Sequence, residues 1–249
     1  MPQWTPDVEI DDTIGAQLLA SRFPELSPVS LRLLGSGWDN HAYLVNGTTV
    51  FRIPHRKLGA ELMETECTFL AYLAQHHLPL PIPNPQFVAA PDERFPYRIA
   101  GYPLIEGTTA DGVEWTLAER AANAEALGRF LAALHRIPSN VPFAIGDKLK
   151  RADLQYRLPI ALSDLSDAPK GLREVFEEIG TTPQFDRQPV WVHGDLYSRH
   201  LVVDPYRRVC GLIDWGGRPC RRPRPRHLDR VDVSAPGFLG RLQGGLRRC

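Results

Sequence analysis

The stretch WVHGDLYSRHLVVDPYRRVCGLIDWGG, residues 191–217, decides which fold this chain is expected to have. Its first apolar residues lead into His193-Gly194-Asp195, and a second acid, Asp214, follows the apolar pair Leu212-Ile213. Between them, Asp204-Pro205 is a turn signal that separates two β-prone runs. The stretch therefore predicts a hairpin that brings the surroundings of Asp195 and Asp214 together.

Two carboxylates at the edge of β structure fit phosphoryl transfer to an alcohol. In that reaction one carboxylate orients and deprotonates the hydroxyl, and a second holds the Mg²⁺ that bridges the phosphates. Asp195 is the candidate for the first role and Asp214 for the second. The alternative, that Asp195 only closes a turn after Gly194, leaves the nearby His193 and the Asp214 hairpin unexplained.

A glycine-rich separator lies between two β-prone runs near the N-terminus. The runs are 29–34 and 42–45; a third covers 48–53, and Asn46-Gly47 before it predicts a tight hairpin turn. Gly35-Ser36-Gly37 would let backbone amides approach phosphates, which makes it a candidate nucleotide loop. Taken alone, these glycines are better interpreted as a plain hairpin turn.

One cation and one acid are expected to pair near this loop. Arg52 lies among apolar neighbours on the third strand, and Glu66 lies on the apolar stripe of a helix predicted over 58–77. Burying Glu66 without a partner would cost several kcal/mol, so we expect it to face Arg52. The alternative places Glu66 at the edge of the stripe, in water.

The other patterned segments predict a protein of mixed helix and strand. A helix is expected from the Asp11-Asp12 cap to about Phe23, with Ile14, Leu18 and Leu19 on its apolar side. Thr116-Leu117-Ala118-Glu119 is a capping box that begins a helix ending at His135. The remaining expected elements are strands over 86–90 and 97–104 and helices over 149–158 and 172–179.

Composition narrows the function classes. The chain has 249 residues, 43% of them hydrophobic, which suffices for one large core or two small lobes. It has no basic and apolar leader and no run of about 18 apolar residues, so we expect a cytoplasmic protein that does not span a membrane. The four cysteines form no CxxC pair, so neither a zinc site nor a disulfide framework is expected.

A zero net charge conceals an uneven distribution. Residues 218–249 contain nine Arg and two Asp, whereas residues 1–217 contain 20 basic and 27 acidic residues. An acidic body would steer a cationic substrate toward the protein, although mild acidity is also common among soluble proteins without that purpose.

The two motifs resemble those of a known family. His193-Gly194-Asp195-Leu196 and the later Leu-Ile-Asp-Trp-Gly, at 212–216, are similar to the catalytic and metal-binding motifs of the aminoglycoside phosphotransferases, antibiotic kinases with a protein-kinase-like fold. The resemblance covers about 29–217. It implies an α+β, two-lobe fold in three parts: a small antiparallel-sheet N-lobe at 1–104, a mainly helical and incomplete C-lobe at 105–217, and an irregular basic tail at 218–249.

The resemblance also implies a role for each candidate residue. Asp195 would be the acid–base residue, and Asp214 and His200 would hold Mg²⁺. His193 is a second catalytic candidate, although a role in bracing the loop through hydrogen bonds suits it better than proton transfer. His200 stands where kinases usually have Asn, and macrolide phosphotransferases resemble this chain in having His there. ATP or GTP would be bound by the glycine loop, the ion pair and the hinge: Gly35, Ser36, Gly37, Arg52, Glu66, Pro103, Leu104 and Ile105.

The implied activity is transfer of the γ-phosphate of ATP or GTP to a hydroxyl of a small molecule, an aminoglycoside or a macrolide. Two alternatives stay open: a kinase for a metabolic alcohol, and a catalytically inactive nucleotide-binding remnant. Family members continue past the second motif with a Gly-Asp-Pro segment and helices, whereas Arg, Pro and Gly dominate 218–249 here. We therefore expect a truncation or a change of reading frame after residue 217, and no nucleic-acid partner.

Overall fold

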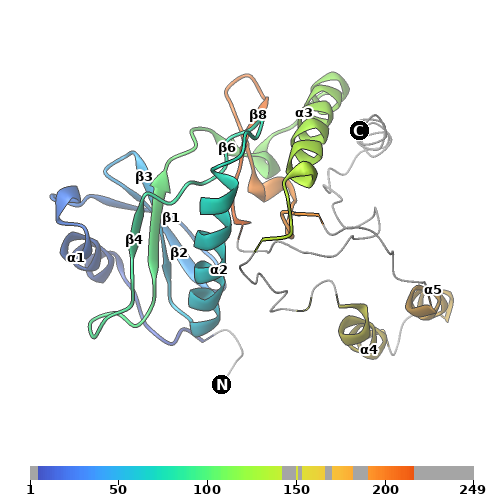
Figure 1. Cartoon of the computed structure of the whole chain (residues 1–249), viewed down its shortest axis with the longest axis horizontal. Coiled ribbons are helices and arrows are strands. Elements are labelled where there is room, and N and C mark those ends of the chain that lie inside the picture. Colours follow the sequence, from blue (N-terminus) through green and yellow to red (C-terminus); the bar gives the residue numbers. More distant parts are fainter. Residues whose placement is uncertain (1–4, 142–149, 151–152, 166–169, 182–189, 216–249) are drawn as a thin grey trace.

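The computed structural model describes residues 5–141, 150, 153–165, 170–181 and 190–215. A five-stranded antiparallel sheet lies near the N-terminus, with helices α1 and α2 on opposite sides of it (Figure 1). Its strand order is β1-β2-β3-β5-β4, formed by β1 (Leu31–Ser36), β2 (Asn40–Val45), β3 (Thr49–Pro54), β4 (Phe87–Ala89) and β5 (Ile99–Pro103).

The hairpin between β2 and β3 has the turn that its sequence predicts. Asn46 and Gly47 both have positive φ, 51° and 74°, the backbone shape that an Asn-Gly turn adopts between twisted strands. The Asn46 side chain also accepts from the Ser30 amide and donates to the Leu26 carbonyl. The turn is therefore stabilised by hydrogen bonds to the segment before β1 as well as by its own backbone conformation.

Strand β3 divides its side chains between two faces, since successive residues of a strand point in opposite directions. Phe51 and Ile53 enter a core shared with Leu18 and Leu19 of α1 (Asp12–Arg22), whereas Arg52 reaches α2 (Lys57–Leu73). The α1 helix begins as predicted, with the Asp11 side chain accepting from the Ile14 amide.

Ile14 does not belong to the apolar side of α1 as expected. Its side chain is 44% exposed, and Gly15 is buried instead. A Cβ on Gly15 would lie 3.2 Å from Leu31, so the helix approaches β1 closely at this point. That approach turns the preceding residue toward solvent.

Helix α2 ends at Leu73, four residues before the predicted end. Past this point the amides of Gln75 and His76 donate to the carbonyls of Tyr72 and Leu73, so the chain tightens into turns with three-residue spacing. At its other end α2 has no side-chain cap of its own, and Asp7 accepts from the Lys57 amide at 2.6 Å. An acid 50 residues earlier thus performs the capping.

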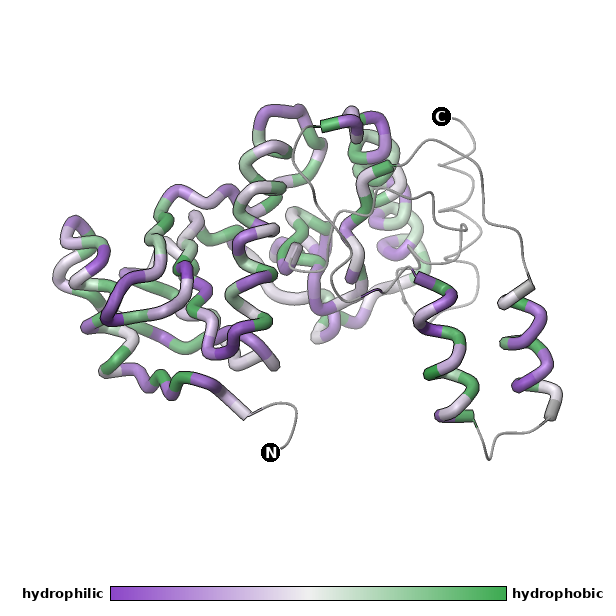
Figure 2. The backbone as a smooth tube through the Cα atoms, turned by 60° about the horizontal axis from the view of Figure 1, so that its bottom comes forward, coloured by the Kyte–Doolittle hydropathy of each residue, from purple (hydrophilic) through white to green (hydrophobic). Residues whose placement is uncertain are grey.

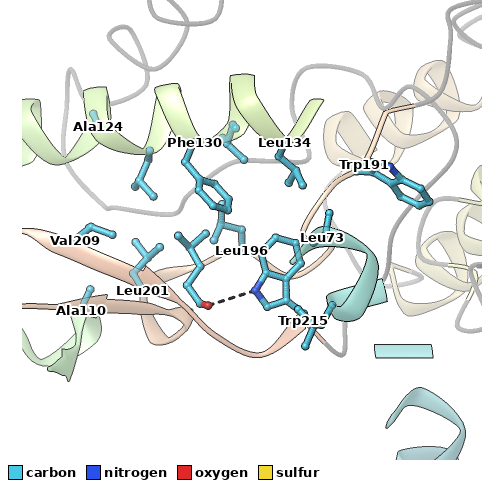
Figure 3. Close-up of a cluster of buried hydrophobic side chains, with 14 of the residues drawn as sticks. Leu73, Ala110, Ala124, Phe130, Leu134, Trp191, Leu196, Leu201, Val209 and Trp215 are labelled. Atoms are coloured by element: carbon cyan, nitrogen blue, oxygen red, sulfur yellow. Dashed lines mark hydrogen bonds between the residues drawn. The ribbon is translucent and has the colours of Figure 1, made fainter. Parts of the chain in front are cut away.

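A second core lies under α3 (Leu117–Arg136), where Figure 3 shows Phe130 and Leu134 above the strands and near Trp215. The capping box of α3 is present as predicted, with Thr116 and Glu119 bonded reciprocally. Below α3, β6 (Thr108–Thr109), β7 (Leu201–Val203) and β8 (Val209–Leu212) form a three-stranded sheet. The β7–β8 pair is the hairpin that the turn signal at residue 204 predicts.

Asn123, which is 3% exposed, fixes α3 to this hairpin. Its amide nitrogen donates to the Arg207 carbonyl, and its oxygen accepts from the Val209 amide. A buried Asn with both ends bonded is specific for one arrangement of helix and hairpin.

Helices α4 (Leu154–Asp164) and α5 (Lys170–Thr181) pack against each other and lie side by side in both views (Figures 1 and 2). The first begins later than predicted, because the Asp153 side chain accepts from the Tyr156 amide and caps the helix there. The second is longer than the predicted 172–179.

Three short 3₁₀ helices complete the described elements, at Pro24–Leu26, Ala110–Gly112 and Ser198–His200. The described helices include none with the length and apolar character needed to cross a bilayer. The predicted division at residue 104 stays a prediction. The expected tail and the proposed break after residue 217 fall within 216–249, outside the described residues.

Candidate functional site

One cavity of about 1230 Å³ gathers most of the residues that the sequence singles out. It lies where the glycine loop, β3, α2, the segment after β5 and both motif segments meet. Pro103 and His193 do not line it. The predicted site residues that do are Gly35, Ser36, Gly37, Arg52, Glu66, Leu104, Ile105, Asp195, His200 and Asp214.

The predicted contact between Arg52 and Glu66 is present. Nη1 of Arg52 lies 2.7 Å and 2.6 Å from the two carboxylate oxygens of Glu66. The side chains are 12% and 3% exposed, so the alternative of a solvated Glu66 is excluded. Burial opposes the charge of Arg52, but the Glu66 and Asp214 carboxylates outweigh it and raise the pKa of the guanidinium.

Arg52 also contacts the second motif, which the sequence did not indicate. Its Nη2 lies 3.2 Å from Oδ1 of Asp214. One guanidinium therefore joins three elements: β3 through its own backbone, α2 through Glu66, and the segment after β8 through Asp214. Arginine suits this position because its planar group presents several donors in fixed directions.

Asp195 follows a glycine whose backbone few other residues could adopt. Gly194 has φ +86°, and this turn sets Asp195, half-buried, at the cavity. The Asp195 carbonyl accepts from Nδ1 of His200 at 2.6 Å. The backbone on both sides of the candidate acid–base residue is thus constrained.

His193 is fully buried and does not line the cavity. Its Nε2 donates to the Ile213 carbonyl at 3.0 Å, and its ring lies 4.5 Å from that of Trp215. Burial, with the nearby charge of His200, lowers the pKa of His193 to about 4. A neutral imidazole in this place braces the loop before Asp214, and a catalytic role of His193 stays a prediction.

Asp214 is held in an unusual backbone shape by its neighbours. Its φ is +61°, in the left-handed region that Asp tolerates better than most residues, and its side chain is 44% exposed. Burial of the carboxyl acts to raise its pKa, but the Arg52 charge and the His200 hydrogen bond outweigh this and lower it. The side chain is therefore ionised throughout the neutral range.

His200 connects the two motif segments directly. It donates through Nδ1 to the Asp195 carbonyl, and its Nε2 lies 3.1 Å from Oδ2 of Asp214. Burial acts to lower the pKa of His200, while the bond to Asp214 raises it more, so the net shift is upward. The imidazole fixes the relative positions of Asp195 and Asp214.

The donor set around Asp214 fits Mg²⁺ only in part. Mg²⁺ is usually held by one or two carboxylates, with phosphates and water supplying the other oxygens. Asp214 provides one ionised carboxylate that opens on the cavity, and among the described residues no group of three or more His, Cys, Asp or Glu could hold a metal ion. Asp214 therefore fits such a site, whereas the His200 nitrogen is a poorer ligand for this cation.

The glycine loop has space that the fold itself does not use. A Cβ on Gly35 would meet nothing within 4 Å, and one on Gly37 would be 3.5 Å from the Asn40 carbonyl. Neither glycine has a positive φ. The fold thus tolerates side chains at both positions, and contact of this loop with a nucleotide stays a prediction.

The hinge segment is less open to a ligand than expected. The Leu104 amide already donates to the Thr48 carbonyl, and Pro103 has no amide hydrogen. Leu104 and Ile105 line the cavity, but Pro103 pairs with Thr49 inside the sheet. Contact of this segment with a base stays a prediction.

Several cavity residues were missed by sequence reasoning. Trp38 lines it from the glycine loop, Tyr197 and Arg199 line it from the segment just after the first motif, and Arg199 pairs with Asp111 at 3.1 Å. Tyr197 and Arg199 lie within the stretch 191–217, so their closeness to Asp195 in sequence could have indicated that they line the cavity. Asp111 has no comparable signal.

Comparison with known proteins shows the family of this chain. The model of the phosphotransferase enzyme family, APH, matches residues 30–217. The chain belongs to this family. The matched range agrees with the extent of the resemblance seen in the sequence.

Solved structures of similar fold come from the same class of enzymes. The GDP complex of wild-type aminoglycoside 2'-phosphotransferase-IIIa has 23% identity and a TM-score of 0.78, over 96% of this chain and 83% of its own. The streptomycin-ATP-APH(2")-IIa ternary complex has 20% identity and a TM-score of 0.69, over 97% and 86%. Macrolide 2'-phosphotransferase MphH from Brachybacterium faecium, as apoenzyme, has 21% identity and a TM-score of 0.69, over 95% and 82%.

These similarities show the predicted α+β, protein-kinase-like fold, with an antiparallel-sheet lobe followed by helices. Family membership shows the class of the protein as a phosphotransferase.

Proposed function

We propose that this chain transfers the γ-phosphate of ATP or GTP to a hydroxyl of an aminoglycoside or macrolide antibiotic. Membership of the phosphotransferase family supports the reaction class. The bound molecules of similar structures, GDP in one and streptomycin with ATP in another, support a purine nucleotide as donor and an antibiotic as acceptor.

The observation that carries the proposal is the shared cavity. Asp195 and Asp214 lie in the same cavity as the Arg52–Glu66 pair, although the sequence separates that pair widely from both acids. Phosphoryl transfer depends on positioning and charge stabilisation more than on covalent chemistry by the protein. A cavity with a carboxylate near an anchored cation supplies both.

Each group has a stated role in this proposal. The Asp195 carboxylate accepts a hydrogen bond from the acceptor hydroxyl and takes its proton as the oxygen attacks. Arg52, held by Glu66 and Asp214, presents positive charge to the phosphates. The amides around Gly35 and Gly37 approach the phosphates where no side chain intervenes.

The metal belongs to the nucleotide in this proposal. Asp214, with His200 beside it, would hold Mg²⁺, which neutralises phosphate charge when bound. His200 keeps Asp214 in place through its contact at 3.1 Å and leaves the other oxygen facing Arg52.

Cavity charge is compatible with a cationic acceptor. Acidic residues outnumber arginines along its lining, and Arg52 is already engaged by two of the acids. A net negative cavity raises the local concentration of cations such as an aminoglycoside. The lining acids are Asp39, Glu66, Asp111, Asp195 and Asp214, and the arginines are Arg32, Arg52 and Arg199.

We further propose that residues 1–104 form the nucleotide-binding N-lobe and that residues 105–217 form a partial C-lobe with the catalytic and metal-binding segments. Consistent with this, Arg52 and Glu66 come from the first range and Asp195 and Asp214 from the second.

An acceptor panel tests the proposed function. Purified full-length chain is incubated with Mg²⁺ and γ-labelled ATP or GTP, together with several aminoglycosides, a macrolide, choline or a sugar. Label transfer to an antibiotic is the expected result. Transfer to the metabolic alcohols alone would replace the antibiotic by that acceptor, and nucleotide-dependent stabilisation without any transfer would identify an inactive nucleotide-binding protein.

A further inference from the structure

The tip of the glycine loop, Trp38 and Asp39, is bonded to His55 and Arg56 in the connection between β3 and α2. Nη1 of Arg56 lies 2.9 Å from Oδ1 of Asp39 and donates to the Trp38 carbonyl at 3.2 Å. The same carbonyl accepts from Nε2 of His55 at 3.0 Å, and the His55 amide donates to the Asp39 carbonyl at 3.0 Å. Two consecutive residues of the loop are thus bonded to two consecutive residues of the connection.

The connection is itself anchored at the start of α2. A Cβ on Gly59, in the first turn, would lie 2.5 Å from the Asp39 carbonyl oxygen, so loop and helix are in direct contact. Asp7 caps the same turn through the Lys57 amide and accepts from the Tyr97 hydroxyl at 3.1 Å. The connection to which the loop is bonded is therefore itself held in place.

The loop residues line the cavity, whereas the arginine that holds them does not. Trp38 and Asp39 both line the cavity, and the Trp38 side chain is 65% exposed although its carbonyl carries two hydrogen bonds. Arg56 does not line the cavity, and its side chain is only 14% exposed. Arg56 can therefore affect a ligand in the cavity through its contacts with Trp38 and Asp39 of the loop.

We propose that Arg56 is a positioning residue for the nucleotide, a statement that rests on the proposed function. By holding Asp39 and the Trp38 carbonyl, it keeps the loop in one conformation before the nucleotide arrives. Ordering a free loop would subtract from the binding free energy, so a loop that is already held binds phosphates more tightly. The same contacts connect the loop to α2, the helix that carries Glu66.

A purely structural ion pair would behave differently. Such a pair would change melting temperature and leave the affinity of the folded protein for each ligand unchanged. Replacing a positioning residue raises the Kd for nucleotide, while the KM for the acceptor is maintained. Separate measurement of the two ligands therefore distinguishes these roles.

The test uses Arg56→Met, Arg56→Lys, Asp39→Asn and the double variant Arg56→Met/Asp39→Asn in the full chain. Arg129→Met is the matched control, since it removes an exposed pair at 2.6 Å on α3. Calorimetry measures the Kd for MgATP and MgGTP, and melting curves establish that each variant is folded.

Arg56→Met and Asp39→Asn each remove the ion pair between the two side chains and are each expected to weaken nucleotide binding about tenfold. The double variant should be little weaker than either single one, because both remove the same contact. Arg56→Lys should fall between them and the wild type, and Arg129→Met should match the wild type.

Equal nucleotide Kd values for the wild type and Asp39→Asn, or full additivity in the double variant, would overturn the inference. If Arg56→Met does not fold, Asp39→Asn carries the test, because it keeps the side-chain shape. Failure of the wild type to bind either nucleotide would overturn the proposed function itself, and this outcome is separate from the comparison of variants.

Discussion

Replacing Arg52 by methionine would leave the carboxylate of Glu66 buried without its cation. The two side chains are 12% and 3% exposed, and both Glu66 oxygens lie within 2.7 Å of Nη1. Methionine retains much of the apolar stem, so the main change is loss of the charge. Breaking such a buried pair from one side typically costs about 3 to 5 kcal/mol of unfolding free energy.

The cost should depend on pH in a defined direction. Burial already raises the pKa of Glu66, and without Arg52 nothing at 2.7 Å opposes that shift. A raised native pKa means that the protonated carboxyl is favoured in the folded state, so stability falls as pH rises from about 4.3 through the native value. Urea unfolding of Arg52→Met should therefore show a larger loss near about pH 8 than near about pH 5.

Two variants serve as controls for this prediction. Arg129→Met removes a pair at 2.6 Å whose side chains are 64% and 69% exposed, and it should cost about 0.5 kcal/mol or less. Arg52→Met/Glu66→Leu removes both charges and should recover most of the loss. A cost below about 1 kcal/mol for Arg52→Met near neutral pH, or a double variant no more stable than the single one, would refute the reasoning.

Three further outcomes follow from the same structure. Burial lowers the pKa of His193 to about 4, so between about pH 6.5 and 4 the unfolded chain binds a proton at this residue and the native chain does not. As the pH is lowered through this window, the free energy of unfolding should therefore fall by up to about 3 kcal/mol relative to that of His193→Asn. Gly194→Ala places a Cβ at φ +86° and should cost about 1 to 3 kcal/mol in denaturant unfolding. Gly35→Ala should leave stability within about 1 kcal/mol of the wild type, yet raise the nucleotide Kd in calorimetry.

Each of these outcomes has its own check. If the free energy of unfolding changed with pH in the same way for the wild type and His193→Asn, the prediction for His193 would be wrong. Gly112→Ala, at a position with open space and no positive φ, is the control for Gly194→Ala and should be nearly neutral. Unchanged nucleotide affinity in Gly35→Ala would mean that no phosphate approaches the loop at this residue.

The sequence was most informative where a local pattern has one physical solution. Asn46-Gly47 predicts its turn because few other pairs accept two positive φ values, and the capping box at Thr116 predicts the start of α3. The contact of Arg52 with Glu66 was predictable because a buried acid needs a cation and the third strand offered one.

Features that depend on the tertiary arrangement were not predictable. Asp7 caps α2 from 50 residues away, and Asn123 fixes the β7–β8 hairpin from α3. The contact of Arg52 with Asp214 required the two parts of the chain to be placed against each other. No periodicity or spacing encodes such pairs, since their partners become neighbours only after packing.

His193 shows how far motif reasoning reaches within the site itself. A role in bracing the loop through hydrogen bonds was expected, and its buried side chain donates to the Ile213 carbonyl. Which carbonyl would accept this bond could not be predicted, because Ile213 becomes a neighbour of His193 only after packing.

The most direct test of the central claim compares Asp195→Asn with the wild type in phosphate transfer and nucleotide binding. The wild type should transfer label from ATP or GTP to an aminoglycoside or macrolide. Asp195→Asn should lose that transfer by at least about a hundredfold, as expected for loss of a general base, while it binds MgATP or MgGTP with nearly unchanged Kd. Transfer by Asp195→Asn at the wild-type rate would contradict the assignment of this cavity as the phosphotransfer site.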